Sequence, residues 1–184
     1  MTFIFKQIYR IIKDGTKSLL YDIEGKKRSK FQVYSGFTFV PIIICAITIW
    51  KEISFKDIID TLLTVLSIFT ALIFNVLFSV PDKLSQRIEK LKNKTDNSTK
   101  NYLVRFINFT RSFVQQISFI IVICIVLIIL LVFLKVTTDN IIILILTTIS
   151  SVLFYDLIMY ILMILSNIYT LLMNDIDINE KDLF

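Results

Sequence analysis

Four long apolar segments dominate the chain. They cover residues 33–50, 58–80, 113–134 and 141–160 or beyond, and the third of them contains no charged residue. At about 1.5 Å of rise per residue, helices of this length match the roughly 30 Å hydrocarbon core of a bilayer. The pattern therefore predicts an all-α fold, a polytopic membrane protein with four transmembrane helices in a domain of residues 33–174.

The segment before the first span, residues 1–32, follows a helical period of its own. Ile4, Ile8, Ile11 and Ile12 recur at helical spacing opposite basic side chains. This arrangement predicts an amphipathic helix that lies on the inner leaflet of the membrane.

The polar segment between the second and third spans, residues 81–112, predicts a helical hairpin that extends both spans. Apolar side chains recur at helical spacing on both sides of Asn93 to Asn101, a stretch rich in Asn, Ser, Thr and Asp. That composition is typical of a turn, so we expect the hairpin to reverse there.

The fourth apolar segment is longer than a bilayer requires. A single helix from Asn140 to Met173 would run about 50 Å, some 20 Å more than the hydrocarbon core. Its last third therefore needs a protein neighbour as cover, either the N-terminal helix of the same chain or a second subunit. A short acidic tail, residues 175–184, follows.

Basic residues predict the orientation. Eight Lys and Arg precede the first span and eight lie between Pro81 and Ser112, whereas the other two loops hold three. Short loops rich in Lys and Arg stay on the cytoplasmic side. Because heavy use of Ile, Lys and Asn is typical of AT-rich bacterial genomes, we expect a multi-pass protein of the bacterial inner membrane with both termini and the hairpin in the cytoplasm.

Polar residues within the second and fourth spans form two narrow helix faces. Small polar side chains mediate close helix packing in lipid, and they also line water-filled paths. Both interpretations stay open. The candidate pore or gate residues are Asp156, Asn75, Ser67, Thr64, Tyr160 and Asn167.

Asp156 is the most informative of these residues, because ionisable groups inside membrane segments usually face a bundle interior or water. It lies about 22 Å along the fourth span, and Asn75 lies about 25 Å along the second. We expect the two side chains at matching depth, able to hydrogen-bond across a shared interface. The third span has no such polar face and is expected to contact lipid all round.

The basic segments are candidate ligand- or lipid-binding surfaces. One interpretation is attraction to anionic lipid, and the other is a cytoplasmic nucleic-acid or nucleotide ligand whose phosphates are neutralised by Lys and Arg. The residues concerned are Lys83, Arg87, Lys90, Lys94, Arg105, Arg111, Lys26, Lys27 and Arg28.

Catalytic chemistry is poorly represented. The chain has no His, and Cys45 and Cys124 fall in different apolar segments, so neither a metal site nor a disulfide is expected. The three glycines are isolated and form no phosphate-binding loop. The sequence therefore predicts no enzyme, no metal and no cofactor.

In size, topology, basic cytoplasmic helices and lack of catalytic residues, the chain resembles small four-helix membrane effectors of bacterial anti-phage defence systems, the Hailong type among them. The resemblance covers the whole chain in outline. It implies a homo-oligomeric ion channel that depolarises the inner membrane under the control of a cytoplasmic nucleic-acid or nucleotide signal. It implies no role for individual residues.

Two other functions fit the same pattern. One is a non-conducting membrane anchor or accessory subunit that recruits a cytoplasmic protein partner. The other is a holin-like lysis protein.

Overall fold

The structure, a computed structural model, describes residues 2–18, 29, 35–91 and 97–181. These residues form helices and short connections without any β-strand, which confirms the all-helical prediction. The elements are α1 (Thr2–Ser18), a π-helix η1 (Ser35–Phe39), α3 (Val40–Trp50), a 3₁₀ turn η2 (Lys56–Ile58), α4 (Ile59–Leu91), α5 (Asn97–Val136) and α6 (Asn140–Lys181).

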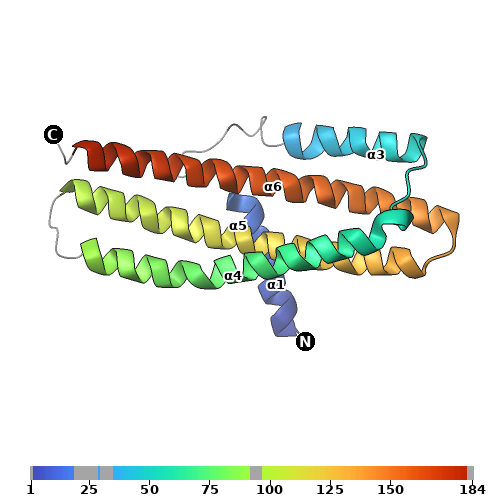
Figure 1. Cartoon of the computed structure of the whole chain (residues 1–184), viewed down its shortest axis with the longest axis horizontal. Helices are drawn as coiled ribbons and strands as arrows, with labels where there is room; N and C mark the ends of the chain where they lie inside the picture. Colours follow the sequence, from blue (N-terminus) through green and yellow to red (C-terminus); the bar gives the residue numbers. More distant parts are fainter. Residues whose placement is uncertain (1, 19–28, 30–34, 92–96, 182–184) are drawn as a thin grey trace.

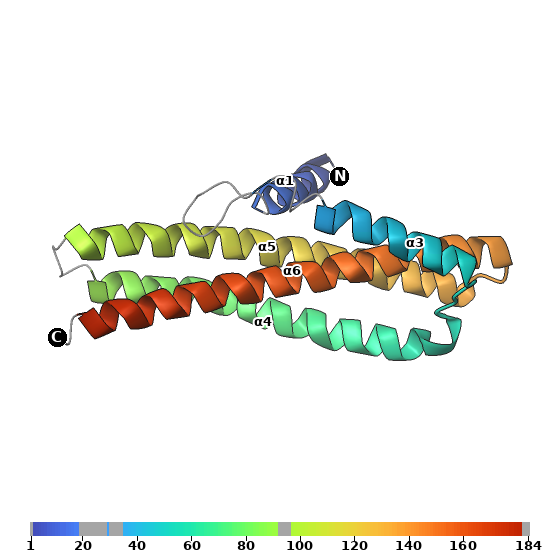
Figure 2. The ribbon, with the colours of Figure 1, turned by 90° about the horizontal axis from the view of Figure 1, so that it is seen from above.

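Three of these helices build an elongated bundle. α4, α5 and α6 run side by side along the long axis, and α5 packs against both of the others (Figure 1). α3 packs on α6 over one end of the bundle, and α1 packs on α5 near its middle. Seen from above, α1 lies on the α5 side of the bundle, and α6 crosses α4 in this view (Figure 2).

Within the described residues, three helical segments are long and apolar enough to cross a membrane, as judged by length and composition. They are Lys56–Ser79, Phe106–Val136 and Asn140–Tyr169. The first predicted span, residues 33–50, corresponds to a shorter apolar helix, Ser35–Trp50. It consists of 5 residues of π-helix followed by 11 residues of α-helix.

The core of the bundle is built around α5. Cys124, Leu127, Leu131 and Leu134 are all 0% exposed, and Ile121 is only 6% exposed. The expectation that the third span contacts lipid all round is therefore wrong. Lipid tails are as apolar as leucine side chains, so an unbroken apolar sequence suits a protein core as well as it suits lipid.

The hairpin between α4 and α5 is helical on both sides, and its turn is shorter than predicted. α4 continues to Leu91 and α5 already begins at Asn97, so Asn97 to Asn101 are helical. Asn, Ser and Thr are favoured at helix N-termini as well as in turns, which explains the error. The predicted long fourth helix is confirmed, and α6 continues past Met173 to Lys181.

Candidate functional site where four helices meet

α1 is held against α5 by a close approach at Gly15. A Cβ atom added to Gly15 would lie 2.6 Å from Cβ of Phe119, which leaves no room for a side chain. Gly15 and Ser18 are buried, and the Ser18 hydroxyl donates a 2.6 Å hydrogen bond to the Gly15 carbonyl. Small residues allow helices to approach this closely. Gly15 thus fixes the point at which α1 crosses the bundle.

Three aromatic rings from η1, α5 and α6 meet at the same level; we call Phe37, Phe119 and Tyr160 the aromatic junction. The centroid of the buried Tyr160 ring lies 4.9 Å from that of Phe119 and 5.3 Å from that of Phe37. Contacts of this geometry stabilise by about 0.5–1.5 kcal/mol beyond the area they bury.

A hydrogen bond connects α6, next to the aromatic junction, to η1. The Tyr155 hydroxyl on α6 donates a 3.1 Å hydrogen bond to the carbonyl of Gly36 in η1. A π-helical turn such as η1 leaves backbone groups outside the regular α-helical pattern, and such turns occur frequently at functional sites. η1, α5 and α6 are therefore tied together where α1 crosses.

Asp156 lies one helical turn before Tyr160 and is partly buried. Its Oδ1 atom is inaccessible and accepts no hydrogen bond, and the Nε2 atom of Gln116 on α5 is likewise buried without a partner. A buried polar group left unpaired costs about 1–3 kcal/mol, and more when it is charged. Native structures keep few such groups, and each calls for an explanation in terms of water, an ion or function.

α6 carries two further groups of this kind. The hydroxyl groups of Thr147 and Ser150 make no hydrogen bond, and both residues are 0% exposed. Together with Asp156 they place three unsatisfied polar side chains along one helix of the apolar part of the bundle.

The polar face predicted on the second span points away from the bundle. Thr64, Ser67 and Asn75 are exposed, whereas α4 buries Ile59 and Leu66 on its other side. The expected contact between Asn75 and Asp156 is therefore not formed within one chain. Sequence spacing predicted one shared face correctly, but it could not tell which way that face points.

The polar side chains on this α4 face differ in how they are satisfied. The Thr64 hydroxyl donates to the Asp60 carbonyl at 2.8 Å, and the Ser67 hydroxyl donates to the Leu63 carbonyl at 2.7 Å. Such bonds back to the preceding turn satisfy hydroxyl groups inside a helix. The side-chain amide of Asn75 lies at the surface of the chain, where a neighbour can reach it.

The remaining candidates differ in whether the structure describes their side chains. Asn167 is buried on α6, and Arg111 is exposed on α5. Of Lys83, Arg87, Lys90 and Arg105 the structure describes the backbone but not the side chain, and Lys94, Lys26, Lys27 and Arg28 lie outside the described residues. The proposed basic surface therefore stays a prediction.

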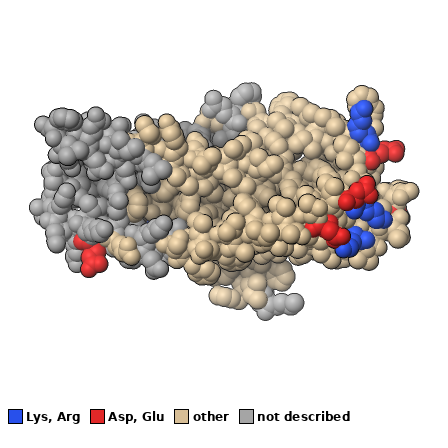
Figure 3. Space-filling view, in the orientation of Figure 1, with Lys and Arg blue, Asp and Glu red and all other residues tan. Residues whose placement is uncertain are grey.

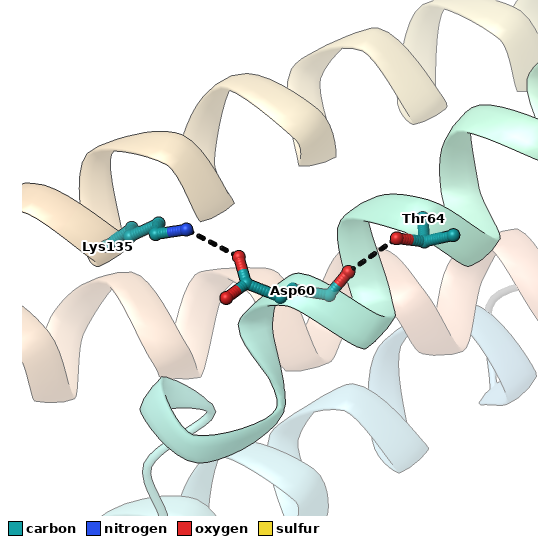
Figure 4. Close-up of polar contacts among 3 residues, drawn as sticks. All are labelled: Asp60, Thr64 and Lys135. Carbon is teal, nitrogen blue, oxygen red and sulfur yellow. Dashed lines mark hydrogen bonds and ion pairs between the residues drawn. The ribbon is translucent and has the colours of Figure 1, made fainter.

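Charged side chains mark one end of the bundle. Lys135 in the last turn of α5 pairs with Asp60 in the first turn of α4 at 2.5 Å, and Thr64 follows on the same helix (Figure 4). Both charges are favourable at their helix ends. On the face drawn in Figure 3, described charges gather at this end, an acidic group lies at the opposite end, and the described surface between them shows none. The pair is solvent-exposed, so it contributes at most about 1 kcal/mol.

No family model matches this chain, and neither a curated protein nor a solved structure is significantly similar to it. Its functional assignment therefore depends on its own residues and geometry. Sequence reasoning singled out Asp156 and Tyr160 but missed Gly15, Phe119 and Phe37. Gly15 did carry a signal, because a glycine inside an amphipathic helix costs about 1 kcal/mol relative to alanine and usually has a packing reason.

Proposed function

We propose that the chain is a subunit of an oligomeric ion-conducting pore in the bacterial inner membrane, which it crosses four times with both termini in the cytoplasm. The observation that carries the proposal is the Oδ1 atom of Asp156, buried without a hydrogen-bond partner in the apolar part of the bundle. Ionisable groups inside membrane segments usually face a bundle interior or water, and they often mark ion or proton paths.

The point at which α1 crosses the bundle supports a bilayer that covers the part of the bundle between α1 and the charged end. The stretch of α5 from Phe119 to Lys135 runs about 24 Å, and that of α6 from Asn140 to Tyr160 about 30 Å. Both distances are close to the thickness of a hydrocarbon core. In this arrangement the charged end carrying Asp60 is external, and α1 lies in the inner headgroup region.

The short helical segment Ser35–Trp50 fits the same thickness of hydrocarbon core. Ser35–Trp50 is about 24 Å long, and it begins beside Tyr155, close to the aromatic junction. It therefore extends from the level of α1 to the external loops. α1 itself exposes Phe5, Tyr9 and Ile12, which suit burial in the lipid boundary.

The path belongs between subunits, because the core of one chain is filled by fully buried leucines such as Leu127 and Leu131. α4 offers the exposed polar face that such a path needs. Lipid tails cannot satisfy the amide of Asn75, whereas a neighbouring subunit or water can.

Electrical recording from purified protein in anionic bilayers tests the proposal. We expect discrete conductance that Asp156→Asn and Asn75→Leu both alter, while Ile129→Leu, at an exposed apolar position of α5, leaves it unchanged. Protein that inserts but stays electrically silent, with and without nucleotide or short single-stranded DNA, would refute the pore.

The outline resemblance to anti-phage effectors supports control of the pore by a ligand that binds the basic cytoplasmic segments. If a nucleic-acid signal controls the pore, short single-stranded oligonucleotides will bind saturably, and the affinity will fall steeply with salt as counterions compete. Binding to anionic vesicles alone would favour the lipid interpretation instead.

The second candidate function is a non-conducting anchor that recruits a cytoplasmic protein partner. The apolar core of the single chain favours it, because no polar channel crosses the described part of one subunit. Silent bilayers combined with a copurifying partner protein would make this the leading function.

A further inference from the structure

A groove of about 590 Å³ lies at the charged end of the bundle, between the α3–α4 connection and the start of α6. Glu52 and Lys56 line it from the connection, and Asn140, Ile141 and Leu144 line it from α6. The connection and the start of α6 lie at the same end of the bundle in Figure 1. The groove is separate from the aromatic junction, so it is a second place where a ligand can bind.

Two contacts hold the α3–α4 connection in place, so the groove exists before any ligand binds. The Phe55 ring packs edge to face on the Phe154 ring of α6, with the ring centroids 6.2 Å apart. The Lys56 ammonium donates a 3.1 Å hydrogen bond to the carbonyl of Thr137, in the connection between α5 and α6. An ammonium group has three N–H donors, so two of them remain for a ligand.

Glu52 occupies a backbone position that favours glycine. Its φ is 49°, and it is the one non-glycine residue with positive φ in the described part of the chain. The amide of Ile53 donates to the carbonyl of Thr48 at 3.1 Å, which is the Schellman hydrogen bond that closes α3. The residue before Ile53 must then be left-handed, and any side chain there is strained. Glycine would avoid this strain, yet the chain carries a glutamate.

The carboxylate of Glu52 lines the groove without a partner. Among the residues that the structure describes, it forms no ion pair and no hydrogen bond, whereas Asp60 at the same end of the bundle pairs with Lys135. Strained residues concentrate at active sites and ligand clamps, where the side chain serves a purpose that offsets the strain. The strain and the unpaired carboxylate at one residue both point to a ligand with a positive charge.

The groove lies where the membrane spans begin. Lys56 and Asn140 are the first residues of two of the three described segments that are long and apolar enough to cross a bilayer. Beyond Asn140 the α6 surface is apolar, since Ile141 is 71% exposed and Leu144 is partly exposed. In the proposed placement this level is the outer boundary of the hydrocarbon core, where lipid headgroups meet acyl chains. A ligand with a charged head and apolar chains fits such a groove.

The geometry points to a zwitterionic phospholipid of the outer leaflet, of the phosphatidylethanolamine class, as the occupant of this groove. Its ammonium group is complementary to the Glu52 carboxylate and its phosphate to the Lys56 ammonium, while its acyl chains follow Ile141 along α6. An anionic phospholipid would leave Glu52 without a counter-charge, so the groove discriminates against it. The inference rests on the bilayer placement in the proposed function but not on conduction.

Fluorescence quenching of Trp50 tests the inference on the full chain. Trp50 is the only tryptophan, it is exposed, and it ends α3 two residues before Glu52. The protein is reconstituted in bilayers of phosphatidylethanolamine and phosphatidylglycerol at one fixed ratio, with brominated chains on either the first lipid or the second. Brominated phosphatidylethanolamine should quench more strongly, with a preference of about fivefold, as expected for one ion pair at the edge of water.

Three variants assign the preference to the groove. Glu52→Gln keeps the size of the side chain and should abolish the preference, whereas Asp57→Asn, which removes an exposed acid of the same connection outside the groove, should leave it unchanged. Glu52→Gly should also abolish it, while raising the midpoint of thermal unfolding in detergent because the strain is relieved. Lys56→Gln should weaken both lipids alike when each is titrated alone in detergent, since both carry a phosphate.

Equal quenching by the two brominated lipids would overturn the inference, and so would a preference that survives Glu52→Gln. Displacement of the brominated lipid by water-soluble phosphoethanolamine would overturn it too, because the groove would then take a soluble ligand. If neither brominated lipid quenches Trp50, this end lies outside the bilayer, and the membrane placement fails together with the lipid site. A lipid preference in electrically silent protein would uphold the site and refute the pore, whereas conductance without the preference would do the reverse.

Discussion

At the scale of single residues, Gly15 and Gly36 form a matched pair that tests how α1 is held. A Cβ at Gly15 would meet Phe119 at 2.6 Å, whereas one at Gly36 would meet only the end of Met159 at 3.8 Å. We expect Gly15→Ala to weaken the docking of α1 by about 1–3 kcal/mol, the usual cost of overpacking. Gly36→Ala should be neutral or stabilising.

Thermal unfolding of the two glycine variants in detergent, together with proteolysis of α1, measures the difference. Both glycines are helical, so any gain in helix propensity, about 1 kcal/mol, is shared by the two substitutions. Equal effects of the two variants would show that the close approach at Phe119 is not what fixes α1.

Asp156→Asn separates a structural from a functional carboxylate. The Oδ1 atom accepts no hydrogen bond, so replacing the carboxylate by an amide removes a charge without breaking a contact at that atom. We expect the free energy of unfolding to stay the same or rise, because an unpaired charge is the costlier group to bury. Denaturant titration checks this, and a loss of stability would mean that Asp156 makes an essential structural tie.

At the scale of helices, the sequence predicted which helices exist and how long they are. It predicted less well which way their faces point. Periodicity identified α1, the hairpin helices and the unusual length of α6, because each depends on local spacing. It did not predict that α5 is the central helix or that the α4 polar face points outward. Those features depend on which helices neighbour one another, and an apolar sequence carries little information about that in a lipid-like environment.

The central position of α5 makes a stability prediction. Leu131→Ala removes a side chain that is fully buried, so it should cost about 2–5 kcal/mol through lost contacts and a cavity. Ile129→Ala, two residues away at a position 48% exposed, should cost much less. Chemical denaturation of both variants in the same detergent compares them, and similar losses would contradict the central role of α5.

At the scale of the whole molecule, the bundle divides where α1 crosses it. On one side lie the charge-poor parts of α3 to α6, which end in the Asp60–Lys135 pair. On the other side α4, α5 and α6 continue together without α3 (Figure 1). A bilayer at the first part and cytoplasm around the second would account for both the charge distribution and the position of α1.

Site-directed labelling tests this placement of the membrane. Cysteines introduced one at a time in a Cys45→Ala background at Asn97, the first residue of α5, and at Asn140, the first residue of α6, lie at opposite ends of the bundle. In intact cells a membrane-impermeant thiol reagent should modify Asn140→Cys and spare Asn97→Cys, because loops rich in Lys and Arg, such as the one around Asn97, favour the cytoplasmic side. Permeabilised cells serve as the control, since both cysteines should then react. Modification of Asn97→Cys from outside would reverse the orientation, and would place α1 and the basic segments on the external face, where no cytoplasmic signal can reach them.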